Sequence, residues 1–110
     1  MKQYISITIG RNIGNKPMDN STWINFQTES FNVLATHAQV DGQIFIGDGV
    51  GIWGYVHEDA HAYIVLADKV DQPALRKDLA SLATKYQQDA IGCVIVDLPN
   101  GDESLVFADK

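Results

Sequence analysis

The segment Tyr4–Met18 reads YISITIGRNIGNKPM and sets how the fold begins. Ile5, Ile7 and Ile9 alternate with tyrosine, serine and threonine, and this period of two predicts a strand with one buried face. Residues 10–16 then contain two glycines, two asparagines, an arginine and a lysine around a single apolar residue, Ile13. A simple connection needs fewer special residues, so this loop is a candidate binding element.

Two helices are predicted from apolar residues that recur at a spacing near 3.6. The first runs roughly over residues 21–37, after N-cap candidates at residues 19–21. The second follows Asp71, with Pro73 in its first turn. Each helix has a single apolar stripe, so both should cover the same face of a sheet.

The remaining elements are strands. The region of residues 43–66 contains the apolar pieces QIFI, GIWGYV and AYIVLA. Between the first two, GDGVG predicts a bulge or wide turn, and between the last two, HEDAH predicts a polar hairpin turn. Residues 91–96 are continuously apolar, which predicts a strand covered on both faces or central in the sheet. LPNGDES, with Asn100-Gly101, predicts a hairpin that leads to a short strand at 105–107.

The predicted order is therefore β-α-β-β-α-β-β, and its first six elements match the ferredoxin-like split βαβ arrangement. We expect a single α+β domain over residues 1–110. Its antiparallel sheet should have four to five strands, with two helices on one face. The other face is left to water, a partner or a ligand.

Several landmarks resemble a family of small uncharacterised ferredoxin-like proteins. They are Gly10-Arg11, Trp23 and Phe26, Gly51-Ile52-Trp53, Glu58 before residues 62–66, and the run from Tyr86 to Ile91. The chain departs from the family pattern at Tyr86-Gln87, where the family has Phe-Gly. TIGRNIGNKPM also resembles small open reading frames that are common in phages. The resemblance implies the fold and a phage setting, and the family has no established activity to transfer.

Composition excludes some classes of function. The net charge is −6, which disfavours general nucleic-acid binding and permits mimicry of nucleic acid. No apolar run reaches about 18 residues and no signal-peptide core is present, so we expect a cytoplasmic protein that does not enter membranes. The lone Cys93 lies in an apolar run, which indicates a buried side chain rather than a nucleophile.

HEDAH, residues 57–61, matches the H-E-x-x-H signature of zinc proteases. That chemistry needs a helix, because only there do His57 and His61 share a face with Glu58 placed as the general base. The flanking segments are strand-like. We therefore interpret HEDAH as a polar turn, with a zinc hydrolase or an adventitious metal site as the alternatives, and expect no cofactor and no functional metal.

An aromatic surface is predicted on the open sheet face. If Ile52, Gly54 and Val56 point inward, Trp53 and Tyr55 point outward. In the next strand, Ala62, Ile64 and Leu66 are expected to point inward. The outward residues of that strand are then His61, Tyr63 and Val65. The first strand adds Tyr4, Ser6 and Thr8. Such a surface has four possible roles. It could form a dimer interface, be covered by the last strand and the chain termini, bind a small aromatic or nucleotide-like ligand, or bind a foreign protein.

The loop beside this surface has the composition of an anion site. Arg11 and Lys16 supply positive charge, while Asn12 and the glycines allow backbone N–H groups to approach a ligand near a helix N-terminus. The alternative is a tight strand-to-helix turn in which Arg11 pairs with a surface acid.

These features predict a non-enzymatic binding protein encoded by a phage, with Arg11, Asn12, Lys16, Trp53, Tyr55, His61 and Tyr63 as its contact residues. We expect a homodimer, with a host protein or an anionic small molecule as a further partner. An inhibitor or ligand sponge acting against host defence would fit. The alternatives are a small dimeric enzyme with a cleft between subunits, the zinc hydrolase, and an accessory subunit that only oligomerises.

Overall fold

The structure is a computed structural model that describes residues 2–98. The predicted Asn100-Gly101 hairpin and the strand at 105–107 lie outside the described residues. Within residues 2–98, neither helix is long and apolar enough to cross a membrane.

The described elements alternate strands and helices in the predicted order, with one small extra hairpin after the first strand. They are β1 (Lys2–Gly10), β2 (Asn12–Ile13), β3 (Lys16–Pro17), α1 (Asn20–His37), β4 (Val40–Trp53), β5 (Val56–Asp68), α2 (Gln72–Lys85) and β6 (Gly92–Leu98).

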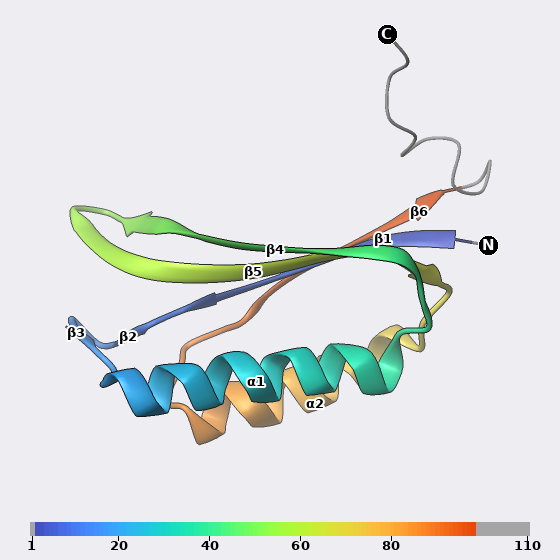
Figure 1. The fold of residues 1–110 in the computed structure, drawn as a ribbon. Helices are drawn as coiled ribbons and strands as arrows, with labels where there is room; N and C mark the ends of the chain where they lie inside the picture. Colours follow the sequence, from blue (N-terminus) through green and yellow to red (C-terminus); the bar gives the residue numbers. More distant parts are fainter. Residues whose placement is uncertain (1, 99–110) are drawn as a thin grey trace, which may run out of the picture.

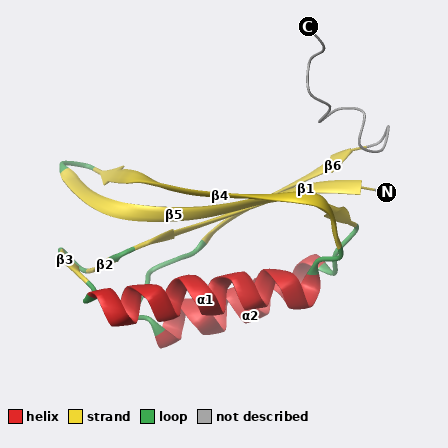
Figure 2. Cartoon of the chain, viewed as in Figure 1, coloured by secondary structure: helices red, strands yellow, loops and turns green. Residues whose placement is uncertain are grey.

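The main sheet has four strands in the order β4-β5-β1-β6, and every neighbouring pair is antiparallel. Both helices lie against the same face of this sheet (Figure 1). Figure 2 shows the same two layers, with the strands above and the helices below. This is the ferredoxin-like arrangement, so the predicted α+β fold is confirmed.

The helices begin where the sequence predicts. The Asp19 side chain accepts a hydrogen bond of 2.8 Å from the backbone N–H of Thr22, and Asp71 caps α2 in the same way through Ala74. Each cap satisfies one backbone donor that the first helical turn leaves without a partner. Capping residues that precede a helical period of apolar residues are enough to locate the N-terminal ends of both helices.

The core lies between the helices and the inner face of the sheet. Ile5, Ile7 and Val65 are fully buried there beside residues of both helices. At the end where α1 begins, the rings of Phe26 and Tyr86 stack with centroids 4.5 Å apart, which joins the two helices. The predicted inward phase of β1 is therefore confirmed.

Two predictions for the β4–β5 region are wrong. GDGVG forms no turn, because Gly47, Gly49 and Gly51 all pair in register with β5 and the ladder is irregular only between Val40 and Ile44. The chain instead reverses at Gly54, whose φ of +59° is the left-handed conformation that favours glycine. HEDAH therefore lies inside β5 and is not a hairpin turn.

The prediction for residues 91–96 also needs correction. Among residues 2–98, strand β6 is at an edge of the sheet and pairs with β1 alone. Its residues Val94 and Val96 are about half exposed on the face away from the helices. A continuous apolar run signals two apolar faces, but it does not show that both faces are covered.

Candidate functional site: an open sheet face with a groove at one end

The face of the sheet opposite the helices is apolar and uncovered by the described residues. The register places Tyr4, Ser6 and Thr8 on this face, as predicted. Their neighbours from the other strands are mostly aliphatic, and Val94 and Phe45 are 56% and 51% exposed. We call this surface the open face; its central members are Tyr4, Ser6, Thr8, Phe45, Gly47, Gly49, Ala62, Ile64, Leu66, Gly92, Val94 and Val96.

The predicted outward placement of His61, Tyr63 and Val65 is wrong. All three point toward the helices and are buried. The hydroxyl of Tyr63 donates a 2.7 Å hydrogen bond to the backbone oxygen of Gln27, and Nδ1 of His61 lies 2.5 Å from Oδ1 of Asp48. Both alternate sets of β5 are apolar enough to be inner, and pairing with β1 selects the set that includes Val65.

Trp53 and Tyr55 are exposed, as predicted, but they lie on a projection and not on the body of the sheet. Residues 50–59 of β4 and β5 pair with each other beyond the end of β1, and we call this segment the hairpin arm. Tyr55 is fully exposed at its turn and Trp53 is 75% exposed. The predicted inward phase of Val56 is wrong, because it pairs directly with Trp53 and shares its side.

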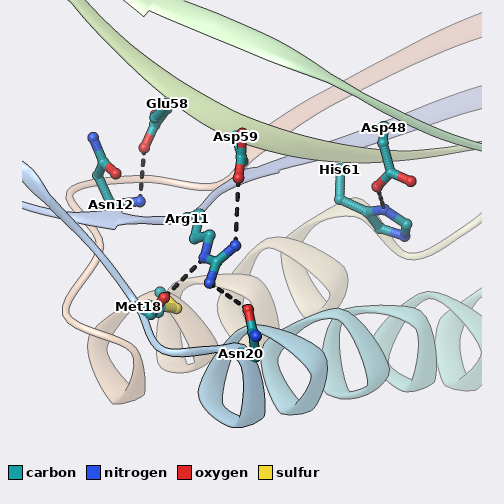
Figure 3. A network of polar contacts seen from close by, with 8 residues as sticks. All are labelled: Arg11, Asn12, Met18, Asn20, Asp48, Glu58, Asp59 and His61. Carbon is teal, nitrogen blue, oxygen red and sulfur yellow. Dashed lines mark hydrogen bonds and ion pairs between the residues drawn. The ribbon is translucent and has the colours of Figure 1, made fainter.

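Arg11 is engaged in a network that connects three segments (Figure 3). Its Nε donates to the backbone oxygen of Met18 at 2.8 Å and its Nη2 donates to Oδ1 of Asn20 at 2.7 Å. Its Nη1 pairs with Asp59 at 3.4 Å. These contacts join the hairpin arm to the start of α1, so they favour the alternative reading in which Arg11 pairs with an acid.

The loop does hold an anion, but that anion belongs to the chain. The backbone N–H of Asn12 donates to Oε2 of Glu58 at 2.9 Å (Figure 3), and the indole N–H of Trp53 donates to Oε1 at 3.1 Å. The carboxylate occupies the space that a side chain at residue 10 would fill, because a Cβ on Gly10 would lie 2.4 Å from Oε1. A side chain at residue 10 would displace the carboxylate from this position.

The side chains of neighbouring residues in β5 thus point to opposite sides of the hairpin arm. Glu58 turns toward the open-face side of the hairpin arm, whereas Asp59 reaches Arg11 on the helix side. Lys16, which the sequence groups with Arg11, is exposed on β3, and the β2–β3 turn uses Gly14 at φ +61°.

A groove lies beside the hairpin arm at the end of the open face. Its volume is about 760 Å³, and it is bordered by the ends of β1 and β6, the β2–β3 turn, the arm and the loop at residues 87–90. Gln88 connects two of these borders by donating from Nε2 to the backbone oxygen of Asn12 at 2.9 Å. Sequence reasoning missed Gln88 and the role of Glu58, because both depend on contacts between distant segments.

The zinc-site geometry that HEDAH suggests is not formed. His57, Glu58 and His61 lie on a strand, where Glu58 points to the side opposite His61. Within residues 2–98, no group of three or more His, Cys, Asp or Glu side chains is placed to hold a metal ion. Cys93 is half-buried, and burial raises the pKa of its thiol.

No protein-family model matches this chain, and no curated protein sequence matches it. Its fold is similar to a solved DUF3240 family protein from Shewanella baltica OS155, with a TM-score of 0.57 and 11% identity over 88% of this chain and 90% of that one. It is also similar to a phage SAM lyase in complex with S-methyl-5'-thioadenosine, with a TM-score of 0.52 and 15% identity over 87% and 81% of the chains. These likenesses concern the fold.

Proposed function

We propose that this protein is a non-enzymatic binding protein that works as a homodimer formed through its open face. The observation that carries the proposal is the apolar character of that face. Burying a large apolar side chain contributes roughly 1.5–3 kcal/mol. Exposed apolar side chains on one face are typical of an interaction site, and here they lie on both sides of the hydroxyl groups of β1, with Phe45 on β4 and Val94 and Val96 on β6.

The distribution of charge favours a second copy as the occupant. The chain has a net charge of −6, so two copies repel each other over much of their surface. The central positions of the open face carry no charged side chain, and the ion pair of Lys2 with Asp68 lies at one end. An uncharged apolar surface is self-complementary across a two-fold axis, which is the commonest symmetry of homodimers.

Two features support binding rather than catalysis. The HEDAH residues are divided between two sides of a strand, whereas zinc hydrolysis needs them on one helix face. The raised pKa of the Cys93 thiol disfavours the thiolate, which is the nucleophilic form.

The proposal is tested by measuring molar mass by light scattering after size exclusion, from low to high protein concentration. We expect a dimer for the wild type and a monomer for Val94→Glu, because a carboxylate would be buried at the centre of the interface. Ile24→Glu is the matched control, since Ile24 is 59% exposed on α1 and Val94 is 56% exposed. A wild type that is monomeric at every concentration, or an Ile24→Glu variant that dissociates equally, overturns the homodimer.

A second candidate is capture of a host protein in a phage setting, as an inhibitor of host defence. The specific observation in its favour is the exposed tip of the hairpin arm, where Trp53 and Tyr55 project. Aromatic residues of this kind are enriched at the centres of interfaces. The test is reconstitution with a purified partner: Tyr55→Ala should weaken that complex without changing the homodimer, and unchanged affinity excludes the tip.

A further inference from the structure

We propose that the groove beside the hairpin arm binds an organic cation, such as an alkylammonium group on a small aromatic body, between Trp53 and Glu58. Trp53 and Glu58, which are to hold the cation, lie on the arm beyond the end of β1. The groove lining also includes Thr8 and Gly92 of the open face, so the site adjoins the homodimer interface proposed above and is tested separately from it through the two arm residues. It also replaces the anionic ligand that the loop composition suggests.

The first argument is the state of the Glu58 carboxylate. Two donors orient it, the backbone N–H of Asn12 at 2.9 Å and the indole N–H of Trp53 at 3.1 Å. A carboxylate has about four acceptor directions, so about two remain for a ligand. An oriented carboxylate that still accepts hydrogen bonds is suited to a cation and repels an anion.

The second argument is the orientation of Trp53. Its hydrogen bond to Glu58 is made by the ring edge, which leaves the faces of the indole available, and the residue is 75% exposed. The face of a tryptophan ring attracts cations more strongly than that of any other side chain. Trp53 and Glu58 therefore present an aromatic face and a negative charge side by side.

The third argument is the charge of the groove as a whole. Glu58 and Asp89 are the ionisable side chains among the residues that line it. Arg11, which belongs to the adjoining loop, turns to the helix side and is engaged by Met18, Asn20 and Asp59. Among the described residues that line the groove, the charged side chains are therefore both acidic, and neither a lysine nor an arginine competes with a cation.

The size and surface of the groove indicate a small organic molecule. Its volume of about 760 Å³ lies in the range of ligand pockets, roughly 300–1,000 Å³. Its floor consists of small residues, including Gly10, Gly51 and Gly92, which leave room above the sheet. The amide of Gln88 at the opposite border adds a neutral polar group.

The test uses three probes of similar size and different charge: benzylammonium, benzyl alcohol and phenylacetate. Binding is followed by NMR through the indole N–H signal of Trp53, which is assigned by its loss in Trp53→Phe. We expect the cation to shift this signal in a saturable way and to bind roughly tenfold more tightly than the neutral probe. Equal affinity for the three probes, or no shift with the cation, overturns the proposal.

Two variants and one control locate the site. Glu58→Gln and Trp53→Leu should each weaken binding of benzylammonium by roughly tenfold. Calorimetric titration measures both variants and the control, because Trp53→Leu has no indole signal at this position. Asp78→Asn removes the same single charge from α2, where Asp78 pairs with His37, and should leave the affinity unchanged. Equal weakening by Asp78→Asn would mean a general attraction to an acidic protein and would overturn the site. Trp53→Leu replaces an exposed side chain, so it keeps the test valid if Glu58→Gln disturbs the arm.

Discussion

The two faces of the main sheet are built from similar side chains, yet only one of them is a core. Val65 on the helix-covered face is 1% exposed, whereas Val94 on the open face is 56% exposed. The strands supply apolar residues to both faces, but each helix has a single apolar stripe and both helices lie on the same side. The hydrophobicity of a strand position therefore does not determine whether it is buried.

The same contrast holds for polar groups at the hairpin arm. On the helix side, Arg11 is fully engaged by Met18, Asn20 and Asp59, and its role is structural. On the open side, the Glu58 carboxylate accepts two hydrogen bonds and still lines a groove. One side of the arm fixes the fold, and the other has the capacity to bind.

The largest expected difference between the faces is in stability. Ile7→Ala removes a fully buried side chain from the helix-covered face and should lower the free energy of unfolding by about 3 kcal/mol. Ile64→Ala, on the open face of the neighbouring strand, should cost about 1 kcal/mol at low protein concentration. Urea unfolding measures both, and equal losses would contradict the assignment of the faces.

A smaller effect is expected from the Arg11 network. Arg11→Met should cost about 1–2 kcal/mol, because it leaves the backbone oxygen of Met18 and the side chain of Asn20 without this donor. Lys16→Met is the control on the same loop, where an exposed position should change stability by less than about 0.5 kcal/mol. Thermal and urea unfolding measure the stability of both variants. If Arg11→Met and Lys16→Met change the free energy of unfolding equally, Arg11 is not the structural connection described above.

The third expected effect appears at alkaline pH. Burial, followed by the hydrogen bond to Glu29, raises the pKa of Tyr86 to about 12. An unfolded tyrosine titrates near 10, so the folded state holds its proton more tightly and this stabilisation is lost as the pH rises from about 10 to 12.

Tyr86→Phe should abolish that component of the pH dependence, and it should cost roughly 1 kcal/mol near neutral pH through loss of the hydrogen bond to Glu29. Absorbance of phenolate at alkaline pH follows the titration. A wild-type curve identical to that of the variant above pH 11 would refute the raised pKa.

The smallest expected effect on the isolated chain is that of Val94→Thr. Threonine keeps the β-branch that suits a strand, and the position is 56% exposed, so unfolding of the dilute monomer should change by less than about 0.5 kcal/mol. The dissociation constant of the homodimer should rise, as measured by sedimentation. An unchanged dissociation constant would remove Val94 from the interface.

Local patterns were sufficient for part of this description. The alternation in β1 correctly predicted its inner residues, Asp71 correctly predicted the start of α2, and Asp19 is the one of three N-cap candidates that caps α1. These signals reside in neighbouring residues, because caps and alternation act over one turn or one strand. The order of elements along the chain correctly predicted the ferredoxin-like α+β fold.

The phase of β5 was not predictable in the same way. Its two alternate sets are both largely apolar, and the outward set with Ile64 is the more hydrophobic one, since the inward set with Val65 also contains His61. Only the pairing of Ile5 with Val65 assigns one set to the core, and shifting that pairing by one residue would exchange the faces.

The amino-acid sequence by itself determined the two helices, the strand β1 and the fold, but not where β4 and β5 are joined or that β2 and β3 form. The tertiary structure alone decided that Tyr63 is buried, that Arg11 is engaged and that Glu58 lies over Gly10 beside Trp53. Caps and periodicity are set by contacts between near neighbours. The groove instead depends on the register of β1, β4 and β5, which brings together groups as far apart as Asn12 and Glu58.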